Sequence, residues 1–163
     1  MSEKLYFTKH GLSMLRREVE MLEKELRALQ SQTAYVAEVG GNQYHDNSSY
    51  ELLVVDLRGI DWRLTNAHHR LNHAVAVDTP TTTDIVSIGT RVKITQDGKD
   101  ITWDIVGFGE SDPNRGLLAY NTPIASLIIG RQVGEIISGS ISGKYTEIEI
   151  LEISIGETNA NAR

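Results

Sequence analysis

Cysteine is absent from this chain of 163 residues, and proline occurs only three times. The lack of cysteine excludes disulfides and thiolate metal sites. The N-terminal residues also lack the apolar stretch of a secretion signal, so we expect a cytoplasmic protein. No apolar run reaches the roughly 18 residues that a membrane-spanning helix needs, and we therefore expect no membrane partner.

Lys and Arg are missing from the whole stretch between Arg27 and Arg58, and the net charge of the chain is −6. The acidic residues in that stretch are Glu38, Asp46, Glu51 and Asp56. Affinity for nucleic-acid phosphates comes from clustered Lys and Arg, so this distribution argues against broad binding of DNA or RNA. An acidic segment of this kind is better suited to entering a cavity that is basic or contains a metal ion.

Two heptad-patterned segments flank a short polar turn at residues 40–47. Apolar residues spaced alternately by three and four form a narrow seam that is buried against another helix. The seam positions are Leu12, Leu15, Val19, Leu22, Leu26, Leu29 and Val36 before the turn, and Leu53, Leu57, Ile60, Leu64, Ala67, Leu71 and Ala74 after it. The pattern predicts an antiparallel coiled-coil hairpin over 1–77.

The ends of the two helices follow from local signals. Thr8 is a candidate N-cap, and Gly40-Gly41 ends the first helix after about Glu38. Asp46, Asn47 or Ser48 can cap the second helix, which should end near Ala76. Arms of roughly 30 residues at about 1.5 Å each would hold the turn about 45 Å from the base. A core alone needs no such reach, so the tip is the first place to look for function.

A sheet domain is expected after a polar linker at residues 78–84. The apolar period changes to two from Ile85, and Asp97-Gly98 and Ser142-Gly143 are hairpin turns. Strands are expected at 85–94, 101–108, 117–120, 134–142 and 144–155. Thr122, Pro123 and Gly130 delimit one short helix. We therefore predict an α+β protein with a mostly antiparallel sheet over 85–155 and a disordered tail at 156–163.

Few side chains could carry chemistry. Asp46 beside a helix start is most simply an N-cap, stabilising by about 1 kcal/mol, but its place at the tip favours a functional role. A lone carboxylate holds a divalent ion poorly, because such ions prefer several oxygen ligands. His69 and His73 have a spacing that could hold a metal, although histidine near a helix end more often interacts with the helix dipole.

The consecutive apolar residues 52–55 cannot all face the seam. Those that are exposed would contact a partner or pack against Tyr35 or Tyr44, and both alternatives stay open.

The predicted architecture and several local motifs resemble the GreA/GreB family of bacterial transcript-cleavage factors. The motifs are Phe7-Thr8-Lys9-His10-Gly11, Leu15-Arg16-Arg17-Glu18-Val19, Val86-Ser87-Ile88-Gly89-Thr90-Arg91-Val92, Ile105-Val106-Gly107, Asn121-Thr122-Pro123-Ile124-Ala125, Leu127-Ile128-Ile129-Gly130 and Val133-Gly134-Glu135. The resemblance implies an FKBP-like C-terminal domain that docks at the rim of the RNA polymerase secondary channel. It also implies that the protein is a monomeric accessory factor and not itself an enzyme. The family is further classed as DNA-binding, so the resemblance implies this for the chain as well.

In this family the hairpin enters the channel, and tip carboxylates help to hold a second Mg²⁺ at the polymerase active site, where water cleaves the backtracked transcript. The factor itself has no cofactor. The residues that the resemblance assigns to polymerase docking are Asn121, Thr122, Pro123, Ile124 and Ala125. Those it assigns to the tip are Asn42, Gln43, Tyr44, His45, Asp46 and Asn47.

The tip departs from the family pattern Gly-Asp-x-x-Glu-Asn-Ala-Glu-Tyr. Alignment on Asn47 places Gln43 on the Asp and Asp46 on the Glu, so one metal-binding carboxylate is replaced by a neutral amide. Val39 and Val54 fall where cleavage-active members carry arginines that contact the transcript. Asp46, aided by Asn42, Gln43 or His45, would face the metal. We expect weak or absent contact with nascent RNA, and we favour non-cleaving or inhibitory action over cleavage stimulation.

Two other functions are considered. A coiled-coil interaction module could bind a different protein through residues 52–55. A peptidyl-prolyl isomerase is suggested only by the FKBP-like fold, and fold alone does not confer function. The two phenylalanines in the chain are few for an aromatic-lined proline pocket.

Overall fold

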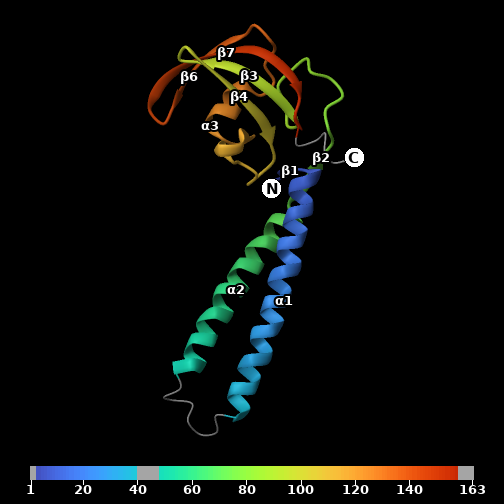
Figure 1. Cartoon of the computed structure of the whole chain (residues 1–163), viewed down its shortest axis with the longest axis vertical. Coiled ribbons are helices and arrows are strands. Elements are labelled where there is room, and N and C mark those ends of the chain that lie inside the picture. The colour runs from blue at the N-terminus through green and yellow to red at the C-terminus, as the bar shows by residue number, and fades with distance from the viewer. Residues whose placement is uncertain (1–2, 40–47, 158–163) are drawn as a thin grey trace. The chain divides into compact units, whose positions relative to one another are not determined.

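The computed structural model describes residues 3–39 and 48–157, in two compact units. One unit spans Ser13–His73, and the other joins Met1–Leu12 to Ala74–Arg163 (Figure 1). The first twelve residues, which the sequence pattern groups with the hairpin, therefore lie in the same unit as the sheet. No helix in the described ranges is long and apolar enough to cross a membrane.

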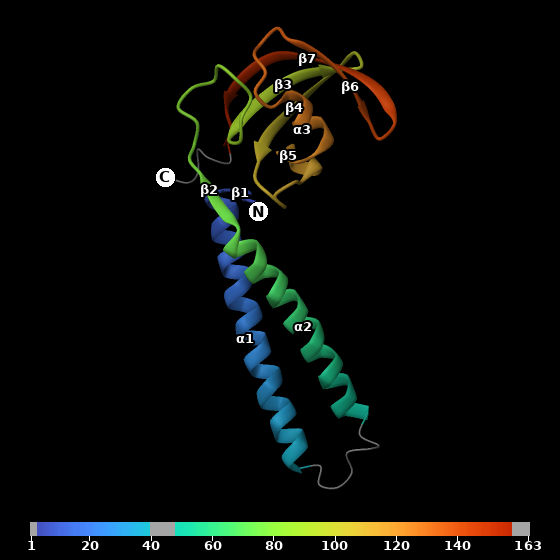
Figure 2. The same ribbon diagram turned by 180° about the vertical axis from the view of Figure 1, so that it is seen from behind.

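The predicted helices are α1, Lys9–Val39, and α2, Ser48–Asn72. The predicted N-cap is confirmed, because the Gly11 amide donates to Thr8 Oγ1 at 3.0 Å. The seam is buried at Leu15, Val19 and Leu22 of α1 and at Ile60, Leu64 and Ala67 of α2. Nearer residues 40–47 the seam positions are only half-buried, and the two helices diverge in both views (Figures 1 and 2). The heptad pattern thus predicted the pairing, which is tight over only part of its length.

The expected end of the second helix near Ala76 is wrong, because α2 ends four residues earlier. The chain then forms β2, Ala74–Val77, which pairs in parallel with β1, Leu5–Thr8. The sequence Ala-Val-Ala-Val alternates β-branched residues and suits a strand as well as a helix. The neighbouring β1 backbone offers hydrogen bonds, so tertiary pairing decides the outcome.

The main sheet has the strand order β5-β4-β3-β7-β6. Its strands are β3, Thr90–Gln96, β4, Lys99–Val106, β5, Leu117–Ala119, β6, Ile136–Ile141, and β7, Lys144–Ile155. All neighbours are antiparallel except β4 and β5, which are parallel. The predicted turns are confirmed: Asp97 and Gly98 have φ of 49° and 80°, and Ser142 and Gly143 have 52° and 79°. Two successive positive φ angles fit the twist of a two-residue hairpin.

The first strand of this sheet begins at Thr90, five residues later than expected. The residues before Thr90 form a turn and not a strand. Thr90 Oγ1 donates to the Ser87 carbonyl at 2.7 Å and accepts from the Ser87 amide at 3.1 Å, which closes this turn. A β-bulge opposite Lys93 and Ile94 leaves Leu151 as an extra residue in β7. Ile150 and Ile153 are therefore buried while Leu151 is only half-buried.

The core lies between the sheet and α3, Pro123–Ile128. Its fully buried side chains include Ile94, Ile105, Ile128, Ile148 and Ile150. Gly139 of β6 leaves the space that the Leu127 side chain occupies, since a Cβ at Gly139 would lie 2.8 Å from it. A short 3-10 helix, η1, at Pro113–Arg115 precedes β5.

Candidate functional site

The tip residues assigned from the sequence lie outside the described part of the chain. These residues are Asn42, Gln43, Tyr44, His45, Asp46 and Asn47. Val39, the last described residue of α1, is 66% exposed, and Val54 is half-buried on α2. The positions flanking the tip are thus apolar.

Residues 52–55 divide as the helical period requires. Leu52 and Val55 are exposed, whereas Leu53 and Val54 are half-buried. Tyr35, the candidate cover on α1, is itself 66% exposed. This part of α2 therefore presents apolar surface, as the sequence predicted.

The segment assigned to polymerase docking surrounds the start of α3. Thr122 caps this helix: its Oγ1 accepts from the Ala125 amide at 3.4 Å and donates to the Ala119 carbonyl at 2.8 Å. Asn121 and Pro123 are exposed, Ile124 is half-buried, and Ala125 is fully buried. A partner could therefore touch the first residues of this segment, whereas Ala125 belongs to the core.

A carboxylate that the sequence did not single out organises the start of α1. Glu110 accepts from the Thr8 amide at 3.0 Å and from the Thr8 hydroxyl at 2.6 Å, across 102 positions of sequence. A Cβ at Gly11 or Gly107 would collide with the Glu110 carboxylate. Two glycines thus make room for one partly buried contact. The only signal in the sequence is a glycine in the first turns of a helix, where alanine is favoured.

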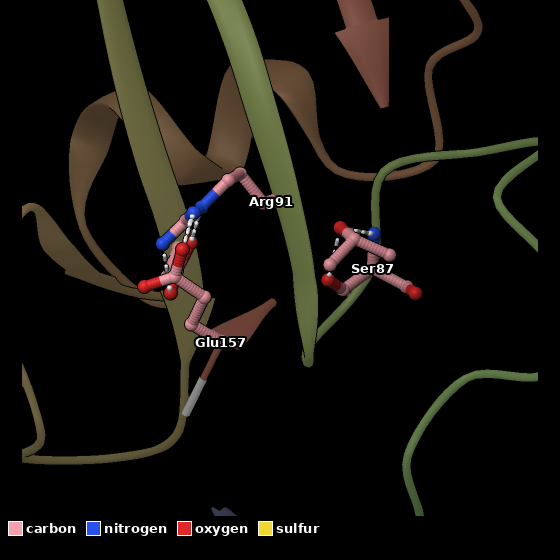
Figure 3. Close-up of polar contacts among 5 residues, drawn as sticks. Ser87, Arg91 and Glu157 are labelled. Carbon is pink, nitrogen blue, oxygen red and sulfur yellow. Dashed lines mark hydrogen bonds and ion pairs between the residues drawn. The ribbon is translucent and has the colours of Figure 1, made fainter. Parts of the chain in front are cut away.

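A second missed feature is an arginine between two carboxylates on the main sheet. Arg91 Nε and Nη2 donate to Asp104 at 2.6 and 3.1 Å, and Nη1 donates to Glu157 at 2.6 Å (Figure 3). The Asp104 side chain is 5% exposed, so Arg91 supplies the counter-charge that its burial requires. Hydrogen bonds to Glu157 and Asp104 raise the pKa of Arg91, and Arg91 lowers the pKa of Glu157. The contact joins the end of β7 to β3 and β4.

Among the described residues, His68, His69 and His73 do not form a metal site with carboxylates. The rings of His69 and His73 lie 4.3 Å apart, and Nδ1 of His73 donates to the His69 carbonyl at 2.7 Å. His68 lies 3.5 Å from Glu23. Over residues 3–39 and 48–157, no three histidine or carboxylate side chains come together as a metal site would need.

Comparison with known proteins covers both units. The family model described as "Transcription elongation factor, GreA/GreB, C-term" matches residues 80–155. Transcription elongation factor GreA of Nitratiruptor sp. is 30% identical over 156 residues, which is 94% of this chain and 94% of that relative. The protein of the same name from Bacillus licheniformis is 30% identical over 93% of this chain and 98% of its own length. Among solved structures, the match to GreA factor homolog 1 of Thermus thermophilus covers 93% of this chain and 99% of that chain at 17% identity. Its TM-score of 0.44 is too low to support a conclusion about this chain.

Proposed function

The chain belongs to the GreA/GreB family of transcription elongation factors, and from this we propose that it binds bacterial RNA polymerase and regulates elongation. The observation that carries the proposal is the 30% identity to GreA over 94% of both chains, which includes the hairpin as well as the sheet unit. In this proposal the α1/α2 hairpin enters the secondary channel, and the factor acts in the cytoplasm as an accessory protein.

The segment at the start of α3 is the proposed docking surface on the polymerase. Asn121 and Pro123 are exposed there, and the Thr122 cap holds them on a short helix that is fixed to the core through Ala125. A rigid helix start presents the same groups to a partner each time, which lowers the entropy cost of docking. The FKBP-like fold and the DNA-binding classification remain predictions of the resemblance alone.

We further propose that this factor stimulates transcript cleavage weakly or not at all. On the tip, Asp46 is the carboxylate available to a polymerase Mg²⁺, because the second family position holds Gln43. Mg²⁺ binds through carboxylates and retains several waters, so replacing one of two carboxylates with an amide weakens the site. Val39 and Val54 also offer no cation to hold the transcript.

A backtracked elongation complex carrying 3′-labelled RNA tests this proposal. The wild-type protein should bind the complex and change the elongation rate with little or no release of short 3′ fragments. The double variant Gln43→Asp/Asp46→Glu restores the family carboxylates, and adding Val39→Arg and Val54→Arg restores the cations. Fragment release should increase in that order.

The matched control makes the same changes away from the tip. Gln30→Asp/Asp61→Glu alters exposed residues of α1 and α2 and should leave fragment release at the wild-type level. Fragment release by the wild-type protein that disappears in Asp46→Ala would instead show that a single carboxylate is enough.

An interaction module for a different partner is the second candidate, favoured by the exposure of Leu52 and Val55. Co-purification with RNA polymerase separates the two candidates. A wild-type protein that fails to bind the polymerase would contradict the elongation role and leave this candidate.

A further inference from the structure

An open groove of about 640 Å³ runs along one side of the hairpin where α1 and α2 diverge. Its apolar lining comes from Ala28, Leu29, Val55, Gly59 and Ile60, and its polar lining from Glu25, Gln32, Asp56 and Arg63. Val55 and Arg63 are eight residues apart, so the groove extends about 12 Å along α2, or roughly two helical turns.

Small residues keep this groove open. Gly59 has no atom within 4 Å of the position where its Cβ would lie, and Ala28 lines the opposite wall from α1. Nearer the base the same side of the hairpin is closed by an ion pair, in which Arg70 Nη2 lies 2.9 Å from Glu18. The groove therefore begins beyond this ion pair along the hairpin, beside the buried seam residue Ile60.

Exposed apolar side chains lie beside the groove. Leu52 is one turn from Val55 on α2, and each is more than 60% exposed. On α1, Met21 and Tyr35 lie seven residues before and after Ala28, so they continue its stripe, and both are at least 66% exposed. A cluster of exposed apolar side chains around a groove is more often a binding site for a partner than a surface that stays in contact with solvent.

We propose that this groove docks an amphipathic helix of another protein, with a narrow apolar stripe flanked by Lys and Arg. The narrow stripe fits because Gly59 and Ala28 allow a helix backbone to approach closely. The basic flanks follow from charge: Glu25 and Asp56 outnumber Arg63, the one cation among the lining residues, and no Lys or Arg occurs between Arg27 and Arg58. A helix that lays its apolar face into a hydrophobic groove is a common mode of recognition.

A second copy of this chain is a poor occupant. Two copies related by a two-fold axis would place the same surface patch against itself. Each groove contributes Glu25, Asp56 and Arg63, so two copies bring four carboxylates and two guanidinium groups together, and this excess of negative charge disfavours association. A basic partner avoids this repulsion.

Fluorescence anisotropy with the full-length protein and two labelled synthetic peptides tests the proposal. Both peptides are 21-residue helices with Leu and Ala on one face; the first has Lys on the flanks and the second has Glu at the same positions. The Lys peptide should bind at least about tenfold more tightly than the Glu peptide, a difference of roughly 1.4 kcal/mol. No polymerase is present, so the result is independent of the proposed role in elongation.

Two variants locate the binding site. Gly59→Leu fills the groove and, with open space around Gly59, should fold normally; it should weaken binding of the Lys peptide roughly tenfold or more. Glu25→Lys/Asp56→Lys removes the acidic lining and should do the same. The matched control Glu20→Lys/Asp61→Lys makes an equal charge change at exposed positions outside the groove and should retain most of the binding.

Three outcomes would overturn the proposal. The first is equal binding of the two peptides, or binding of neither. The second is an equal loss of binding in the groove and control charge variants, which would show a non-specific charge effect. The third is concentration-dependent dimerisation in sedimentation that Gly59→Leu abolishes, which would make a second copy the occupant.

Discussion

Replacing Gly11 with alanine should destabilise this protein, although alanine favours helices. Gly11 lies in the first turn of α1, and its missing side chain leaves the space that the Glu110 carboxylate occupies. An added methyl group would displace this carboxylate. Glu110 would then lose its hydrogen bonds from the Thr8 amide at 3.0 Å and the Thr8 hydroxyl at 2.6 Å.

The magnitude follows from two opposing contributions. Alanine in place of glycine stabilises a helix by at most about 1 kcal/mol. Two hydrogen bonds to a charged acceptor are worth roughly 1.5–3 kcal/mol each, and the half-buried state of Glu110 favours the lower end of that range. Gly11→Ala should therefore lower the free energy of unfolding by about 2 kcal/mol, or the melting temperature by roughly 10 °C.

Tryptophan fluorescence can follow the sheet unit alone. The chain has two tryptophans, Trp62 on α2 and Trp103 on β4. In a Trp62→Phe background, urea unfolding reports only on Trp103, in the unit that contains Gly11 and Glu110. The matched control is Gly59→Ala, a helical glycine with open space around it; it should raise the stability of the hairpin, followed by circular dichroism, by up to about 1 kcal/mol.

A double-mutant cycle gives the refuting result. If the collision with Glu110 is the cause, Gly11→Ala should become neutral or slightly stabilising in a Glu110→Ala background. A Gly11→Ala variant that is stabilised like Gly59→Ala, or a loss that persists without Glu110, would show that the carboxylate is not the reason for this glycine.

Three further predictions concern the sheet unit. Arg91→Ala should reduce the free energy of unfolding, measured in urea, by about 2 kcal/mol. Breaking a fully buried ion pair costs roughly 3–5 kcal/mol, and the loss is smaller here because Arg91 is partly exposed. Asp104→Asn in the Arg91→Ala background should restore part of the loss. Glu157 has a lowered folded-state pKa, so its stabilising contribution is complete above its ordinary pKa of 4.5 and is lost as the pH falls through the folded value; Glu157→Gln should flatten this part of the acid-unfolding curve. Thr122→Val should cost about 1 kcal/mol in thermal unfolding through loss of the α3 cap, and Thr122→Ser should retain it.

Local signals in the sequence predicted most of the elements. The heptad spacing placed α1 and α2, the Asp97-Gly98 and Ser142-Gly143 pairs placed two hairpin turns, and Thr122-Pro123 placed the start of α3. Each of these signals depends on residues within a turn or two of one another. The wrong assignments arose where pairing with a segment distant in sequence determined the structure. Ala74–Val77, for example, pairs with β1 as a strand and does not continue the second helix.

For the candidate site, too, some properties follow from the sequence alone and others from the tertiary structure. Residue identity alone determined that the tip carries Asp46 and Gln43, and that no Lys or Arg lies between Arg27 and Arg58. The two acids at the matching family positions are what the resemblance implies. Resemblance to a family also followed from short motifs. These are properties of residue identity and order, so they need no coordinates.

Only the tertiary structure decided which side chains meet. Glu110 reaches Thr8 across 102 positions, Arg91 joins Asp104 to Glu157, and Ala28 and Gly59 face one groove because α1 and α2 diverge. Helical periodicity says which face of each helix is apolar, but not how far along that face the partner stays in contact. That distance depends on packing between residues far apart in the chain, which local sequence does not encode.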